Sequence, residues 1–212
     1  MINILCFGDS NTYGYKPDGT GRFDENTRWT GLLQNKFGTE YRIIEEGLCG
    51  RTTVFHDEFR DGRRGIDSIG TAVETHNPID MLIIMLGTND CKSRYGASPG
   101  VVAKGLEQII LKAQEKSSQD FKLFIISPIH LGKNVGESGY DPEFDSTSEE
   151  VVSNLPDEYQ MVAERYHANF LDAGAIAKPS EADREHLDES GHMAIAEAIY
   201  RNICDWENMD RY

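Results

Sequence analysis

The sequence has few cysteines, and none of them lies close to another. Its 212 residues include four, which are Cys6, Cys49, Cys91 and Cys204. This spacing excludes a zinc ribbon and a thioredoxin-like redox motif, because both need a Cys-x-x-Cys pair. We therefore expect reduced thiols, as in the cytoplasm, rather than disulfides.

Long apolar runs and the features of a signal peptide are also missing. No run approaches the ~20 apolar residues that a membrane-spanning helix needs. The first ten residues, MINILCFGDS, contain no basic segment and no small-residue cleavage site. These absences predict a cytoplasmic protein that does not have a membrane as a partner.

Positive charge is scarce. The chain carries 21 Lys and Arg against 36 Asp and Glu, which gives a net charge of −15. This balance argues against nucleic acid and anionic membrane surfaces as partners, because both attract a basic face. It also disfavours strongly anionic substrates, unless a local basic pocket overrides the overall field. The nine Tyr and nine Phe argue against disorder.

What the sequence does contain is a regular alternation of strand and helix patterns. Five apolar runs bounded by turn residues predict buried strands, at Ile2–Phe7, Tyr41–Glu46, Ile79–Leu86, Lys122–Ser127 and Asn169–Asp172. Helical spacing lies between them, at Thr30–Phe37, Pro99–Lys116, Ser148–His167 and Ser190–Cys204. The alternation predicts an α/β fold, a single-domain three-layer α/β/α sandwich over residues 1–212. Its sheet would be a flavodoxin-like parallel five-stranded sheet in the order 2-1-3-4-5.

Some details of these elements can be predicted as well. Pro156 should interrupt or restart the helix in which it falls. The last helix should direct one set of apolar residues inward, namely Met193, Ile195, Ala196, Ile199 and Ile203. Two long segments, Tyr15–Glu25 and Pro128–Thr147, have the composition of loops. Long ordered loops in a compact domain are often functional.

Chemically useful residues follow the predicted strands. Ser10 follows the first, Gly50 the second and Asn89 the third, while Asp183 and His186 come after the last. Parallel strands present their carboxyl ends at one edge, so we expect these residues to converge. Together they supply what serine acyl transfer requires: a nucleophile, a base with an orienting carboxylate, and donors for an oxyanion. Each residue alone has an ordinary explanation as a cap, a turn or a surface side chain, so the prediction depends on their combination.

The same segments resemble the four sequence blocks of the SGNH hydrolase superfamily, the GDSL esterases. The matching segments are Phe7–Thr12, Gly50, Gly87–Asp90 and the pair Asp183-x-x-His186. The resemblance implies that Ser10 is the nucleophile and that His186 and Asp183 complete a catalytic triad. It also implies an oxyanion hole made by the amides of Ser10 and Gly50 and the side chain of Asn89.

Further segments are similar to the bacterial arylesterase and acyltransferase branch of this superfamily. They are Arg28–Gly31, Glu45–Leu48, Arg51–Thr53 and Ile83–Asp90. This similarity implies an esterase that hydrolyses, or transfers, short acyl groups of small esters through an acyl-enzyme. It implies no cofactor and no metal, and it implies that copies of the chain can form a homo-oligomer. The chain departs from the family pattern at position 11, where Asn11 replaces a leucine.

Several alternatives remain open from the sequence. His186, Asp188 and His192 have a spacing that suits a metal, although Asp188 or Ser190 as a helix cap, with His192 in the first turn, is the simpler explanation. Arg60, with Arg63 and Arg64, suits an acidic group or a self-paired surface. The chain has no G-x-G-x-x-G, Walker or G-x-S-x-G motif. The alternative functions are a carbohydrate O-acetylesterase and a non-catalytic flavodoxin-like ligand-binding module.

Overall fold

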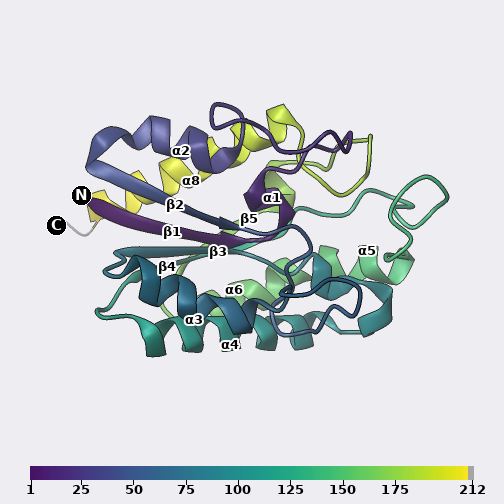
Figure 1. Cartoon of the computed structure of the whole chain (residues 1–212), viewed down its shortest axis with the longest axis horizontal. Coiled ribbons are helices and arrows are strands. Elements are labelled where there is room, and N and C mark those ends of the chain that lie inside the picture. Colours follow the sequence, from purple (N-terminus) through teal and green to yellow (C-terminus); the bar gives the residue numbers. More distant parts are fainter. Residues whose placement is uncertain (210–212) are drawn as a thin grey trace.

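Five parallel strands form one sheet through the middle of the molecule (Figure 1). The computed structural model describes residues 1–209, with side chains as far as Trp206, so residues 210–212 of the predicted domain lie outside the described residues. The strands are β1 (Ile2–Gly8), β2 (Tyr41–Gly47), β3 (Met81–Met85), β4 (Lys122–Ser127) and β5 (Asn169–Asp172). Their order is β2-β1-β3-β4-β5, which confirms the predicted order 2-1-3-4-5.

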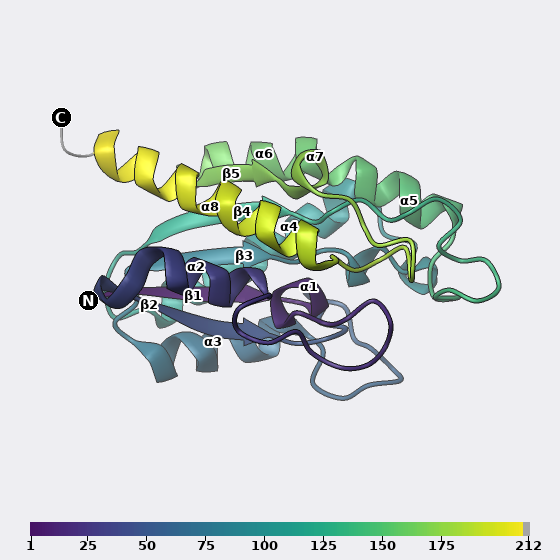
Figure 2. The same ribbon diagram turned by 90° about the horizontal axis from the view of Figure 1, so that it is seen from above.

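Helices cover both faces of the sheet and make the three-layer sandwich that was predicted (Figures 1 and 2). On one face lie α2 (Trp29–Phe37) and α8 (Glu189–Met209). The other face carries α3 (Gly65–His76), α4 (Pro99–Lys116) and α6 (Leu155–Arg165). Three shorter helices are α1 (Ser10–Tyr13), α5 (Ser146–Ser153) and α7 (Ala173–Ile176).

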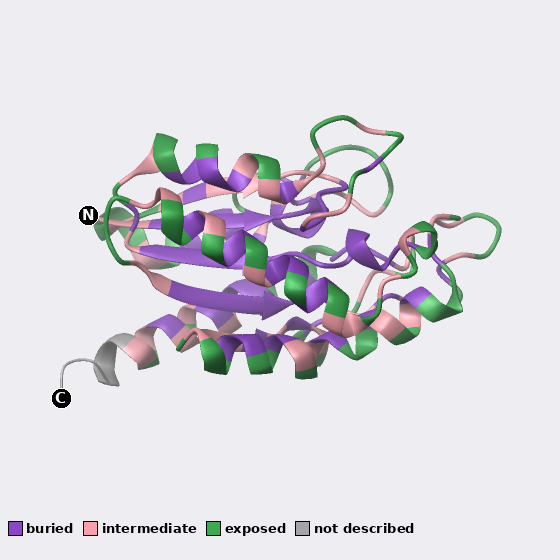
Figure 3. Cartoon of the chain, turned by 90° about the horizontal axis from the view of Figure 1, so that it is seen from below, coloured by how far each residue is buried: buried purple, intermediate pink, exposed green. Residues whose placement is uncertain are grey.

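The strand sequences explain why both faces are covered. Successive side chains of a strand point to opposite faces, so an apolar run needs a partner layer on each side. Leu5 and Phe7 of β1 join the core under α3, α4 and α6, whereas Ile4 and Cys6 join the core under α2 and α8. All five residues of β3 are buried. Figure 3 shows the strands buried and the helices exposed along their outer sides.

The last helix corrects one sequence prediction. Met193 was predicted to point inward, but it is 62% exposed. The buried stripe of α8 begins at His192, which is fully buried, and continues through Ile195 and Ile199. Met193 lies one residue away from this stripe, about 100° around the helix, and therefore faces solvent.

Two further helical segments differ from prediction. No helix was predicted over Gly65–His76, where α3 lies. Its apolar residues Ile66, Ile69 and Val73 have helical spacing, but two glycines and two threonines weaken the signal. Pro156 lies in the first turn of α6, so the predicted interruption takes the form of a new helix that begins at Leu155.

Candidate active site

The sheet brings three of the predicted site residues to one edge. Strand β1 lies between β2 and β3, and its last residue, Gly8, pairs with Gly47 on one side and Met85 on the other. The three strands therefore end level with one another. Ser10, which begins α1, is thus flanked by the segment after β2 and the segment after β3.

A continuous line of hydrogen bonds joins Ser10, His186 and Asp183. The Ser10 Oγ lies 2.8 Å from His186 Nε2, and His186 Nδ1 lies 2.6 Å from Asp183 Oδ2. All three side chains line the same cleft. In this arrangement the ring can accept the Ser10 proton on one nitrogen while the carboxylate fixes the other as a donor. The structure thus brings together the three residues that the sequence predicted as a triad.

The turn that carries Asp183 and His186 is not attached to a strand. The second carboxylate oxygen of Asp183 accepts the backbone N–H groups of Glu185 and His186, both at 3.0 Å. Arg184, inside the turn, has the left-handed φ of 63°. The backbone oxygen of His186 accepts from the N–H of Ser180 at 2.7 Å. The turn therefore orients its own carboxylate and imidazole through local hydrogen bonds.

Asn11 ties this turn to the nucleophile segment. Its side-chain oxygen accepts the backbone N–H of Leu187 at 2.9 Å, and its side-chain nitrogen donates to the backbone oxygen of Glu185 at 3.4 Å. Its own backbone oxygen accepts from the Trp29 indole at 3.1 Å. A leucine could make neither side-chain bond. Asn11, where the chain departs from the family pattern, thus links the segment of Ser10 to the residues on either side of His186. We call this link the strap, and the sequence did not predict it.

The charges around His186 favour its protonated form. Burial lowers the pKa of the imidazole, but the neighbouring carboxylates of Glu185 and Asp183 outweigh this effect and raise it above the usual value. Burial also acts to raise the pKa of Asp183, but hydrogen bonds from the His186 ring and backbone hold it below its ordinary value. The pair therefore stabilises the imidazolium that forms when Ser10 gives up its proton.

The residues predicted to supply the oxyanion donors, Ser10, Gly50 and Asn89, line one cleft. The backbone N–H groups of Ser10 and Gly50 donate no hydrogen bond to another residue within the described part of the chain. Gly50 has φ of 80°, and a Cβ there would come within 2.8 Å of the Arg60 guanidinium. The Asn89 side chain donates one N–H to the Arg51 oxygen at 3.2 Å and lines the cleft. These are donors of the kind that a tetrahedral oxyanion requires.

Buried charges support the oxyanion loop from behind. The Arg51 guanidinium donates to the backbone oxygens of Gly8, at 2.9 Å, and Glu46. Asp90 accepts the backbone N–H of Thr53 at 2.9 Å and also accepts its hydroxyl. Burial raises the pKa of Asp90 to about 7 and that of Asp9 to about 6. The loop after β2 is therefore fixed to the ends of β1 and β3 by ionisable groups.

The cleft in front of Ser10 has a volume of about 530 Å³ and a mixed polar and apolar lining. The two predicted loops supply two of its walls, through Tyr15 and Asp18 from one and Tyr140 and Asp141 from the other. The long loops of the sequence analysis thus lie at the candidate site.

Two basic residues in the cleft are engaged by carboxylates. Lys92 pairs with Glu143, and Arg60 pairs with Asp57 at 3.0 Å and with Glu143 at 3.4 Å. Burial, followed by the charge of Arg60, lowers the pKa of Lys92 to about 8. From the sequence, Arg60 suited either an acidic group or a self-paired surface. The self-pairing holds, but Arg60 also lines the cleft.

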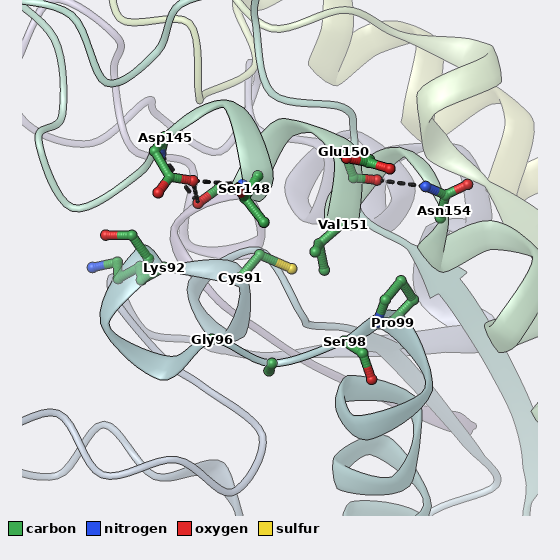
Figure 4. A pocket seen from close by; sticks show the side chains of 13 residues that line it. Cys91, Lys92, Gly96, Ser98, Pro99, Asp145, Ser148, Glu150, Val151 and Asn154 are labelled. Atoms are coloured by element: carbon green, nitrogen blue, oxygen red, sulfur yellow. Dashed lines mark hydrogen bonds between the residues drawn. The ribbon is translucent and has the colours of Figure 1, made fainter.

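A second pocket, of about 450 Å³, lies between the segment Cys91–Pro99 and α5, and Lys92 is one of its lining residues (Figure 4). Two hydrogen bonds join residues of its lining: Asp145 accepts the backbone N–H of Ser148 at 2.9 Å, and Asn154 donates to the Glu150 backbone oxygen at 2.8 Å. None of the predicted catalytic or oxyanion residues lines it.

The second histidine of the last segment has a different environment. His192 is fully buried, and its Nδ1 accepts the backbone N–H of Trp29 at 3.3 Å. Burial lowers its pKa to about 4. Asp188 accepts the Gly191 N–H at 2.8 Å and caps α8, as the simpler interpretation predicted. Within residues 1–209 no group of three His, Cys, Asp or Glu side chains has the geometry of a metal site.

Comparisons with known proteins identify the class to which this fold and site belong. The GDSL-like Lipase/Acylhydrolase family matches residues 6–194. The chain belongs to this family, which confirms the resemblance to SGNH hydrolases and the prediction of an SGNH-type serine acylhydrolase. A comparison with curated proteins finds no match.

Solved structures agree with this assignment. The native M. smegmatis aryl esterase is 28% identical, with a TM-score of 0.87 and coverage of 97% of this chain and 99% of that one. A carbohydrate acetylesterase family member from Sinorhizobium meliloti is 30% identical, with a TM-score of 0.88 and coverage of 96% and 97%. Est24, a carbohydrate acetylesterase from the same organism, is 28% identical, with a TM-score of 0.87 and coverage of 97% and 100%. The chain is similar to these esterases over nearly its whole length.

Proposed function

We propose that this chain hydrolyses small carboxylic esters through an acyl-enzyme on Ser10. His186 acts as the general base, and Asp183 holds the imidazole in the required tautomer. The observation that supports this best is the line of hydrogen bonds from Asp183 through His186 to Ser10, open to a cleft. Family membership supports the esterase chemistry itself.

The proposed reaction proceeds in two halves. His186 Nε2 takes the proton of Ser10 as its oxygen attacks the ester carbonyl, and the amides of Ser10 and Gly50 with the Asn89 side chain receive the negative oxygen. Collapse breaks the bond to the alcohol, which leaves with the proton from His186. Water then attacks the acyl-enzyme by the same route, and the carboxylic acid is released. An alcohol in place of water would give acyl transfer.

Labelling tests the assignment of the nucleophile. A serine-directed phosphonate should add one group, which peptide mass spectrometry should locate at Ser10. Ser10→Ala should fold normally, take up no label and lose nearly all esterase activity. Label at another serine, or full activity in the purified variant, would contradict the role of Ser10. An unlabelled and inactive wild-type protein would favour the ligand-binding alternative.

We further propose that the acyl group is short. Four apolar residues of the 128–147 loop are buried in the two cores rather than in the cleft, namely Ile129, Leu131, Val135 and Phe144. A long acyl chain gains ~0.8 kcal/mol for each CH₂ that is buried, and this gain needs an apolar surface. Apart from Tyr15 and Tyr140, the apolar lining of the cleft consists of small side chains, namely Pro17, Cys49, Pro142 and Ala182. Long chains would therefore remain in water.

A series of aryl esters tests the acyl length. We expect kcat/KM to be highest for acetyl to butyryl esters and not to rise for longer acyl chains. The enzyme concentration is kept fixed, and each ester is used below its solubility limit. A steady rise to dodecanoyl would reveal an apolar channel and contradict this part of the proposal. Acetylated sugars belong in the same panel, because two similar structures are carbohydrate acetylesterases. A marked preference for them would select the O-acetylesterase alternative.

The partners and the compartment remain predictions. No helix within residues 1–209 has the length and apolarity to cross a membrane. We propose a small-molecule ester as the partner, without nucleic acid or membrane, in the cytoplasm. Sedimentation measurements over a range of concentrations would test the homo-oligomer.

A further inference from the structure

The cleft contains a carboxylate that the proposed mechanism does not use. Glu185 lies beside His186 in the turn, and its side chain is only 10% exposed. Its Oε1 is 3.8 Å from His186 Nε2, the nitrogen that faces Ser10. The side chain lines the cleft. In the proposed mechanism His186 Nε2 gives its proton to the oxygen of the leaving alcohol. The Glu185 carboxylate therefore lies next to the position of that oxygen.

Within the described part of the chain this carboxylate has an ionic contact with the His186 ring but no hydrogen bond. Its backbone N–H and oxygen are bonded to Asp183 and Asn11, but the carboxylate accepts no hydrogen bond from any of residues 1–209. Buried carboxylates almost always have a hydrogen-bond partner or an ionic partner. A carboxylate that faces a substrate cleft with one long ionic contact and no hydrogen bond therefore has room for a donor that arrives with the substrate.

The cations that line the cleft form their ion pairs with carboxylates other than Glu185. Lys92 pairs with Glu143, and Arg60 pairs with Asp57 and Glu143, as described above. Six lining residues other than the histidine carry charge, and four of them are acidic, namely Asp18, Asp141, Asp183 and Glu185. The cleft thus adds a local negative field to the overall charge of −15. Such a field concentrates cations and repels anions.

We propose that Glu185 makes the enzyme select esters whose alcohol carries an ammonium group close to the ester oxygen. The selection rests on the proposed esterase function of Ser10 and His186. An ammonium N–H two carbons from the leaving oxygen reaches the Glu185 carboxylate while that oxygen lies at His186 Nε2. The bond is charge-assisted, and such bonds are stronger than those between neutral groups.

Two esters of equal shape test this preference. In 2-(dimethylamino)ethyl acetate the amine is protonated at pH 7, and in 3-methylbutyl acetate a carbon replaces the nitrogen. We expect the wild-type kcat/KM for the cationic ester to exceed that for the neutral one by ~10-fold or more, which corresponds to the low end for a hydrogen bond to a charged group. Equal values, or a preference for the neutral ester, would overturn the proposal.

Matched variants locate the source of the preference. Glu185→Gln keeps the shape and removes the charge, so the ratio of the two kcat/KM values should fall toward one. Glu185→Asp should retain part of it. Glu189→Gln removes a carboxylate four residues away that is exposed and outside the cleft, and it should leave the ratio unchanged. An unchanged ratio in Glu185→Gln, or an equal fall in Glu189→Gln, would contradict a local role for Glu185.

The design separates this proposal from the esterase function. General effects of Glu185 on His186 change both esters alike and cancel in the ratio. If the wild type hydrolyses 4-nitrophenyl acetate but shows no preference for the cationic ester, the Glu185 proposal alone fails. If the folded wild type hydrolyses none of the three esters, both proposals fail.

Discussion

The candidate active site consists of two halves that are positioned by different means. The strand-end half contains Ser10, Gly50 and Asn89, each in the segment that follows a strand. The turn half, Asp183 to His186, follows no strand directly and is held by its own hydrogen bonds and by Asn11. The first half inherits its geometry from the register of the sheet. The second depends on a few side-chain contacts, so small changes should disturb it more easily.

The largest expected effect comes from the base of the turn half. His186→Ala should lower kcat by at least ~1,000-fold, because Ser10 then has no group to accept its proton. His192→Ala is the matched control. It removes an equally buried histidine that accepts from Trp29, and it should reduce stability by ~1–3 kcal/mol while kcat stays within a few-fold. Purified variants should be compared by kinetics and thermal melting. The opposite ranking would refute the assignment of the base.

Asn89, in the strand-end half, should give the next largest effect. Asn89→Ala should lower kcat by ~100–1,000-fold with little change in KM, since an oxyanion donor acts mainly in the transition state. Steady-state kinetics with an aryl acetate measure both constants. A raised KM with an unchanged kcat would mean that Asn89 binds the substrate instead.

The strap between the halves should give an intermediate effect. Asn11→Leu leaves the Leu187 N–H and the Glu185 oxygen without their partner, which should cost ~1–3 kcal/mol of the free energy of unfolding. We also expect kcat to fall by ~10-fold, because His186 loses its alignment with Ser10. Asn35→Ala, at an exposed position of α2, is the control. Full activity in Asn11→Leu would show that the turn half holds its geometry without the strap.

The smallest expected effect is a change in the pH dependence of stability when the buried Asp90 of the strand-end half is replaced. Because its pKa in the folded state is raised to about 7, its contribution to stability is complete below the unfolded value of ~3.9 and is lost as the pH rises toward 7. The asparagine in Asp90→Asn does not titrate, so the variant does not lose stability in this way as the pH rises. The stability of the variant relative to the wild type should therefore improve between pH 5 and pH 8, as measured by chemical denaturation. A difference independent of pH would contradict the raised pKa.

The same division explains what the sequence could predict. The strand-end residues were predictable, because an apolar run marks each strand and the residue after it must lie at the common edge. Asp183 and His186 were found through their spacing and the family resemblance. The contacts of Asn11 were not predictable, because its side chain bonds to residues 174 and 176 positions away in the chain. No local pattern carries that information.

In the fold, local periodicity predicted strands and helices where one face is clearly apolar. Prediction failed at α3, whose glycines and threonines dilute the helical pattern. It also failed at Met193, where a buried polar residue, His192, took the inward position. Hydrophobicity alone could not predict that His192 is buried and Met193 exposed, because His192 accepts a hydrogen bond from the Trp29 backbone N–H.

The hydrogen bond between Ser10 and His186 joins residues 176 positions apart in the chain. During synthesis Ser10 leaves the ribosome before His186, so it has no base until the segment that carries His186 has been made. The proposed activity of this pair can begin only when that segment has docked beside β1. Turnover of a coloured ester by nascent chains would therefore report the moment at which the two segments meet, without any added label.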